Sequence, residues 1–124
     1  MAATKLYKKE GDDKAKAIQE NIEKQFGFLP EVFQAMGNNG DFLESMMKLS
    51  EAAGKNLDKK TKELICVAVS AVTGCGYCLE AHRAMALQAG ITEEEITAAV
   101  EVAAMMSAFN NFNKALGMNH DIKA

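Results

Sequence analysis

Two cysteines and a histidine lie close together in the sequence, and their spacing suits thiol chemistry. Cys75 and Cys78 form a CxxC motif, and His82 follows one helical turn after the second cysteine. Residues three and four positions apart are neighbours on a helix, so a helix that begins at the motif places all three side chains on one face. Two thiols at this spacing can close a disulfide. The motif therefore predicts a reactive thiol with a base beside it.

The elements that position this motif are expected to be helices. Alanine, glutamate, lysine and methionine favour helices, and Pro30 is the only proline of the chain. The expected helices span residues 13–26, 30–36, 41–54, 58–73, 75–89 and 92–109. Asp41 and Asp58 are suited to capping two of them, and Thr92 with Glu95 has capping-box spacing. Residues 1–12 are expected to be a polar, flexible N-terminus, and residues 13–124 a single helical domain.

The last of these helices has apolar positions that are expected to face inward. They are Ile96, Val100, Ala103 and Met106. The chain has 124 residues, 48% of them hydrophobic, which fits one globular domain with a modest core, and it has no internal repeat.

A thioredoxin-like fold is an alternative, because residues 64–72 are rich in β-branched side chains and could form a buried strand before the CxxC motif. Two features oppose it. Thioredoxin-like folds place a cis-proline after the motif, whereas Pro30 lies upstream, and no other run suits a strand. We therefore expect an all-α fold.

Gly74 separates the two expected central helices, and an antiparallel hairpin there brings residues equally far from the bend side by side. Glu63 and His82 are such a pair. A thiol, a base and an orienting acid would then adjoin one another. The thiol of free cysteine, with a pKa near 8.5, is mostly protonated at neutral pH, but an imidazole and a helix N-terminus can lower that pKa.

Each of these residue types is also common at positions without a chemical role. Glu63 can be a solvated helix residue, and His82 a packed or surface histidine. Cys66 suits a small buried hydrophobe, and the eight methionines suit core and subunit contacts. A zinc site of Cys75, Cys78 and His82, with Cys66 or Glu63 as fourth ligand, has partly suitable spacing, but no second CxxC or histidine cluster completes it.

The charge and hydropathy of the chain argue against nucleic acid and membranes as partners. The net charge is -3 without a dense basic run, so we expect no nucleic acid partner. The charged N-terminus and the absence of a long apolar run predict neither a signal peptide nor a membrane segment, and hence a cytoplasmic protein. In a reducing compartment, a CxxC motif is more often a redox pair or metal site than a structural disulfide.

The pattern of Glu63, Cys75, Cys78 and His82, E-x11-C-x2-C-x3-H, resembles that of AhpD-like alkylhydroperoxidases within the carboxymuconolactone decarboxylase superfamily. The similarity runs from about residue 28 to about residue 96. It implies an all-helical AhpD-like fold with a central antiparallel hairpin and the CxxC at a helix N-terminus. It also implies homotrimers or hexamers, and peroxidase or disulfide reductase activity without flavin, haem or metal.

The resemblance assigns roles to the same residues. It implies that Cys78 attacks a hydroperoxide or disulfide, that Cys75 resolves the product, and that Glu63 and His82 relay a proton. A dithiol electron-donor protein would complete the cycle. Tyr77 stands where histidine is frequent in the family, and a phenol cannot act as a base at neutral pH, which predicts slower peroxide turnover or another disulfide as substrate.

Lactone decarboxylation, the reaction that names the superfamily, is an alternative activity. It would use Glu63 and His82 for proton transfer and would need no disulfide. The presence of both Cys75 and Cys78 argues against it.

Overall fold

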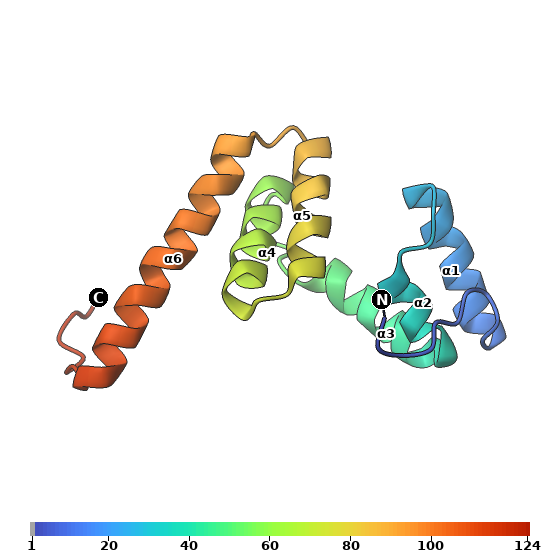
Figure 1. Ribbon diagram of the computed structural model, residues 1–124, viewed down its shortest axis with the longest axis horizontal. Coiled ribbons are helices and arrows are strands. Elements are labelled where there is room, and N and C mark those ends of the chain that lie inside the picture. Colours follow the sequence, from blue (N-terminus) through green and yellow to red (C-terminus); the bar gives the residue numbers. More distant parts are fainter. Residues whose placement is uncertain (1) are drawn as a thin grey trace. The chain divides into compact units, whose positions relative to one another are not determined.

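The computed structural model describes residues 2–124, and its regular structure is entirely helical. No β-strand occurs among these residues, so the predicted all-α fold is confirmed and the strand over residues 64–72 is excluded. The contacts divide the chain into two compact units, one ending at Lys55 and the other beginning at Asn56. Figure 1 shows the helices in chain order.

The first unit contains three α-helices and a short 3-10 helix. They are α1 (Asp13–Phe26), α2 (Glu31–Ala35), η1 (Met36–Asn38) and α3 (Gly40–Ala52). Ala15, Ile22, Leu29 and Leu43 form its buried core. Burial of such side chains is the main favourable term in folding.

A buried glutamine organises this unit. Gln19 is fully buried, and its amide nitrogen donates to the carbonyl oxygens of Tyr7 and Phe33 at 2.9 and 2.8 Å. Its amide oxygen accepts the backbone N–H of Lys9 at 2.7 Å. Because a buried amide is costly unless paired, these bonds hold the segment before α1 against the unit.

The second unit is built from α4 (Lys59–Thr73), α5 (Gly76–Gln88) and α6 (Glu93–Leu116). The helices α4 and α5 pack as an antiparallel hairpin, and α6 packs mainly on α4. Val67, Ala86, Ile91 and Ile96 form the buried core. At the bend, Gly74 has a φ of 76°, a left-handed conformation that glycine adopts without steric cost.

Polar contacts fix the beginning of α6. Thr92 and Glu95 form the predicted capping box, with side chain to backbone N–H distances of 2.9 and 3.1 Å. Lys60 on α4 pairs with Glu95, and Arg83 on α5 pairs with Glu93. The start of α6 is therefore tied to both helices of the hairpin.

Three boundaries or faces differ from the sequence-based expectation. The helix α6 runs to Leu116 rather than to residue 109, because no helix breaker occurs before Gly117, which has a φ of 63°. Asn39, not Asp41, caps α3, through a 3.1 Å bond to the N–H of Phe42. Ile96 and Ala103 of α6 are buried as predicted, but Val100 and Met106 are exposed.

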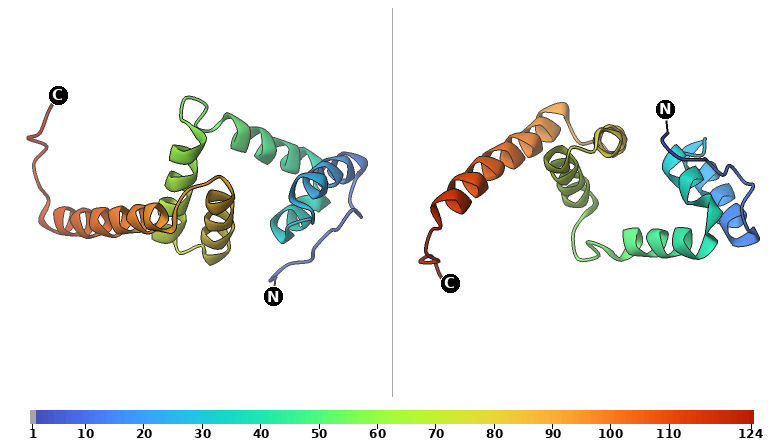
Figure 2. Two further views of the ribbon diagram at one scale, coloured as in Figure 1. Left: turned by 90° about the horizontal axis from the view of Figure 1, so that it is seen from above. Right: turned by 60° about the horizontal axis from the view of Figure 1, so that its bottom comes forward.

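The C-terminal half of α6 extends past the hairpin of α4 and α5, as Figure 2 shows from two further directions. Across residues 2–124 we find no helix with the length and apolar character needed to span a membrane.

Candidate functional site

The CxxC motif lies where α5 begins. Cys75 is the N-cap of α5, with φ −82° and ψ 90°, and its sulfur accepts the backbone N–H of Cys78 at 3.2 Å. A disulfide joins the two residues, whose Cα atoms are 5.3 Å apart. Both residues are partly exposed. The N-terminus of α5 lies at the motif, and the partial positive charge of a helix N-terminus favours a negatively charged group such as a thiolate.

A backbone carbonyl positions this turn. The carbonyl oxygen of Ser70 accepts the N–H groups of Gly74 and Cys75, each at 3.1 Å. These bonds end α4 and set the direction in which the chain enters the motif. Ser70 was not among the predicted residues, because a carbonyl is present at every residue and carries no signal in the side-chain pattern.

Glu63 and His82 face each other across the hairpin, as the position of the bend predicts. Glu63 Oε2 lies 2.9 Å from His82 Nδ1. Their side chains are 13% and 29% exposed, so the pair is largely shielded from water. A carboxylate only accepts hydrogen bonds, so Nδ1 carries the hydrogen in this pair and Nε2 of the neutral ring is the nitrogen able to accept a proton.

His82 also lies one turn after Cys78 on α5, where residues four apart are neighbours. The hairpin therefore brings together the four residues that the sequence singled out: Glu63, Cys75, Cys78 and His82. Two sulfurs that can exchange between thiol and disulfide thus lie at the start of α5, and Cys78 is one helical turn before an imidazole that a carboxylate orients. In such an arrangement the imidazole can accept a proton from a thiol, and the two cysteines can carry out two-electron redox chemistry.

Cys66 is a third cysteine, on α4, and it is free. Burial raises the pKa of its thiol, and the charge of Glu63 raises it further. The thiol is therefore protonated at neutral pH and a poor nucleophile. This protonation state fits a packing role for Cys66 rather than a role in the disulfide.

The zinc-site alternative requires several donor side chains around one point. Within residues 2–124, histidine, cysteine, aspartate and glutamate side chains nowhere gather in threes with a geometry suited to a metal ion. Tyr77, which the sequence also singled out, lies between the two cysteines in the first turn of α5 and is 49% exposed.

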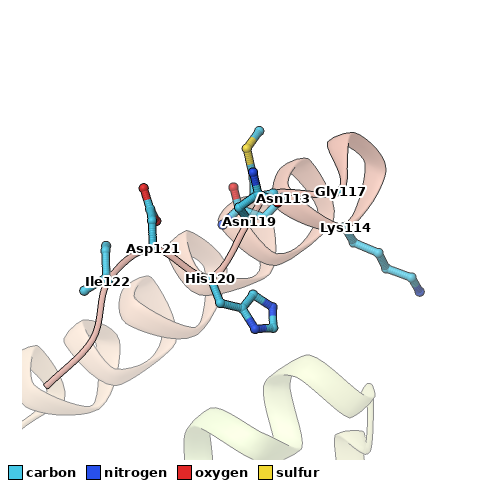
Figure 3. Close-up of a pocket in the computed structure, with 8 residues that line it drawn as sticks. Asn113, Lys114, Gly117, Asn119, His120, Asp121 and Ile122 are labelled. Atoms are coloured by element: carbon cyan, nitrogen blue, oxygen red, sulfur yellow. The ribbon is translucent and has the colours of Figure 1, made fainter.

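A hollow at the C-terminal end of α6 contains none of the candidate residues. It is lined by Asn113, Lys114, Gly117, Met118, Asn119, His120, Asp121 and Ile122. Figure 3 shows the side chains of Lys114, His120 and Asp121 pointing in different directions rather than toward a common centre. We therefore assign the candidate site to the hairpin and not to this hollow.

Comparison with known proteins places the chain in a family. The model of the carboxymuconolactone decarboxylase family matches residues 40–119. The chain therefore belongs to this family. It is 38% identical over 105 residues to "Uncharacterized protein 4 in cox locus" of Paracoccus denitrificans, and the match covers 82% of this chain and 94% of that protein.

Relatives with a named activity are matched over part of their length. The chain is 35% identical over 78 residues to alkyl hydroperoxide reductase AhpD of Rhodopseudomonas palustris, and 38% identical over 66 residues to that of Azorhizobium caulinodans. These matches cover 61% and 53% of this chain but only 43% and 36% of those proteins.

A solved structure shares the fold. The crystal structure of the alkylhydroperoxidase AhpD core from Rhodospirillum rubrum superposes with a TM-score of 0.82. The alignment covers 98% of this chain and 95% of that one, at 23% identity. The AhpD-like helical fold expected from the sequence is thus confirmed.

Proposed function

We propose that this protein is a thiol-dependent oxidoreductase that reduces alkyl hydroperoxides, or disulfides, through Cys75 and Cys78. The observation that carries the proposal is the position of the CxxC pair at the start of α5, one turn from an imidazole that a carboxylate orients. The AhpD relatives support the same activity class. Glu63 and His82 act in this proposal as a proton relay.

The first step is attack on the peroxide. His82 Nε2 accepts the proton of the Cys78 thiol, and the thiolate attacks the distal oxygen of the hydroperoxide. The O–O bond breaks as the S–O bond forms. The leaving alkoxide takes the proton from His82 and departs as an alcohol, and Cys78 becomes a sulfenic acid.

The second step forms the disulfide. The thiol of Cys75 attacks the sulfenic sulfur of Cys78, an S–S bond replaces the S–O bond, and the oxygen leaves as water. The Cα separation of 5.3 Å lies in the normal range for a disulfide, so this step needs no large backbone movement. The structure corresponds to this oxidised form.

The third step returns the site to its reduced form. A dithiol electron-donor protein attacks the disulfide, passes through a mixed disulfide and leaves as a disulfide itself, while Cys75 and Cys78 regain their protons. Over the cycle, one hydroperoxide and one dithiol give one alcohol, one water and one disulfide. Such a cycle requires a reducing compartment, and the cytoplasm is the compartment we propose.

Lactone decarboxylation is the second candidate, and the family to which the chain belongs is named for it. It would use only Glu63 and His82, and it would leave the disulfide without a role. Activity on a carboxymuconolactone that survives Cys75→Ser and Cys78→Ser would favour this candidate.

The test is peroxide consumption by the pre-reduced protein with several dithiol donors. Wild type should lose two titratable thiols per chain on adding one equivalent of cumene hydroperoxide, and turnover should depend on the donor. Cys78→Ser should abolish consumption, whereas the matched control Cys66→Ser should retain it. Equal consumption by wild type and Cys78→Ser would exclude the proposed mechanism.

A further inference from the structure

The end of the hairpin that carries the disulfide contains no charged residue. None occurs from residue 64 to residue 79, a stretch that covers most of α4, the bend and the first turn of α5. Figure 1 shows this bend at the opposite end of the hairpin from the start of α6, where Glu93 and Glu95 form their ion pairs. Those ion pairs therefore lie away from the disulfide.

Exposed uncharged residues flank the two cysteines. Val72, in the last turn of α4, is 59% exposed, and Tyr77, in the first turn of α5, is 49% exposed. Thr73 and Gly76 are exposed as well. We call these four residues the disulfide rim. An apolar side chain and an aromatic ring thus remain in contact with water on both sides of the bend.

Reduction of the disulfide brings its donor into contact with this region. A donor thiolate attacks one sulfur of the pair, and the S–S bond breaks as a bond to the donor forms. The two sulfurs of the resulting mixed disulfide are about 2.05 Å apart. When the donor is a protein, the surface around its thiol must therefore pack on residues that adjoin Cys75 and Cys78. Tyr77, which stands between the two cysteines, is such a residue.

We propose that the disulfide rim is the docking surface of the dithiol donor protein, and that the donor presents an uncharged, apolar surface around its own thiols. The inference rests on the proposed function, because it concerns the third step of that cycle. Tyr77 is the main contact, since a tyrosine ring supplies a large contact area with only two side-chain torsions to fix. Tyrosine is enriched and charged residues are depleted at the centres of protein interfaces.

The charge pattern disfavours a donor recognised through ion pairs. An acidic donor surface, or an anionic thiol such as glutathione, would need lysine or arginine beside the disulfide, and residues 64–79 contain neither. Arg83, further along α5, is paired with Glu93. A basic donor surface would find Glu80, an exposed glutamate two residues after Cys78. A single exposed ion pair contributes little to binding, so apolar contact is the main source of affinity.

Reduction of the oxidised protein without peroxide tests the role of Tyr77. Reduced thioredoxin is the protein-dithiol probe and dithiothreitol the small-molecule probe, and the remaining Cys75–Cys78 disulfide is measured by acid quenching, alkylation and mass spectrometry. Tyr77→Ala should lower the second-order rate constant with thioredoxin by about tenfold or more. The rate constant with dithiothreitol should change by less than about threefold, because a small dithiol makes little contact with the rim. Tyr77→Phe retains the ring and should react as wild type with both probes.

Charge variants test the uncharged character of the docking surface. Val72→Asp and Val72→Lys should both slow reduction by thioredoxin, because either charge loses water in an apolar contact. Both should leave reduction by dithiothreitol nearly unchanged. Gln88→Glu adds a charge at an exposed position at the other end of α5 and is the matched control, with wild-type rates expected for both probes. Acceleration by one sign of charge at Val72 would mean that ion pairs govern docking, and the proposal would be wrong.

The outcomes separate this inference from the proposed function. An unchanged thioredoxin rate in Tyr77→Ala, or equal losses with both probes, would overturn the docking surface. Wild type that dithiothreitol reduces and thioredoxin does not would also overturn it, because the rim would then accept no protein dithiol. Turnover of cumene hydroperoxide with dithiothreitol as the sole donor tests the proposed function and does not depend on the rim. Its absence, with the rim variants behaving as expected, would contradict the peroxide chemistry but not the docking surface.

Discussion

The bond between Glu63 and His82 can be removed by one substitution, and its effect on peroxide attack can be estimated. When His82 takes the proton of Cys78, the ring becomes positively charged, and the 2.9 Å contact becomes a hydrogen bond between two ions. A hydrogen bond to a charged group contributes about 1.5–3 kcal/mol. Glu63→Ala should therefore slow the first attack by about 10- to 150-fold.

The solvent exposure of the Glu63–His82 pair indicates where in this range the slowing by Glu63→Ala should fall. His82 is 29% exposed, so water screens the ion pair in part and favours the lower half of the range. Glu63→Gln retains an uncharged acceptor of the same size and should have a smaller effect than Glu63→Ala. His82→Ala removes the base itself and should slow attack by about a hundredfold or more.

A single-turnover experiment measures this step alone. Pre-reduced protein is mixed with cumene hydroperoxide without a donor, quenched in acid at successive times, and analysed by mass spectrometry for the Cys75–Cys78 disulfide. Glu80→Ala is the matched control, because Glu80 is an exposed glutamate of α5 close to His82 in sequence. A wild-type rate in Glu63→Ala would refute the relay, and the bond would then serve only to hold α4 to α5.

The remaining predictions concern the cysteines and acid stability. Cys75→Ser should keep a near-normal first attack but leave Cys78 as sulfenic or more oxidised acid, detectable by mass, and multiple turnovers should cease. Cys66 should be alkylated far more slowly than the reduced pair at neutral pH and faster only in alkali, because burial raises the pKa of its thiol; equal rates would contradict this. Lys60 lowers the pKa of Glu95 in the folded state, so the stability from this pair is present above the ordinary Glu95 pKa of 4.5 and is lost as the pH falls below it. Thermal unfolding of Glu95→Gln should accordingly depend less on pH in this range than that of wild type.

The site was predictable because its geometry follows from local rules. Gly74 marks the bend, and antiparallel pairing then determines that Glu63 meets His82, as the 2.9 Å contact confirms. The position of Cys78 one turn before His82 follows from helical spacing alone. Neither deduction needs knowledge of how the rest of the chain packs.

The burial of individual side chains could not be predicted, because it depends on contacts between residues far apart in the sequence. Helical periodicity identifies Val100 and Met106 as apolar but not whether the same unit covers them, and both are exposed. Gln19 resembles a surface residue in the sequence, yet it is fully buried because backbone groups from two distant segments satisfy its amide. The predicted end of α6 at residue 109 is too early, since Asn110 and Asn111 have a low helix propensity but continue the helix to Leu116.

The position of Tyr77 gives the protein an optical signal of its own redox state. The chain has no tryptophan and only two tyrosines, so emission excited at wavelengths that phenylalanine does not absorb comes from Tyr7 and Tyr77 alone. Tyr77 is half-exposed and stands between the two cysteines, next in sequence to Cys78, and a disulfide is an effective quencher of a neighbouring phenol. In a Tyr7→Phe variant, fluorescence would therefore rise as the disulfide opens and fall as it closes. Candidate donors could be ranked in real time on unlabelled protein.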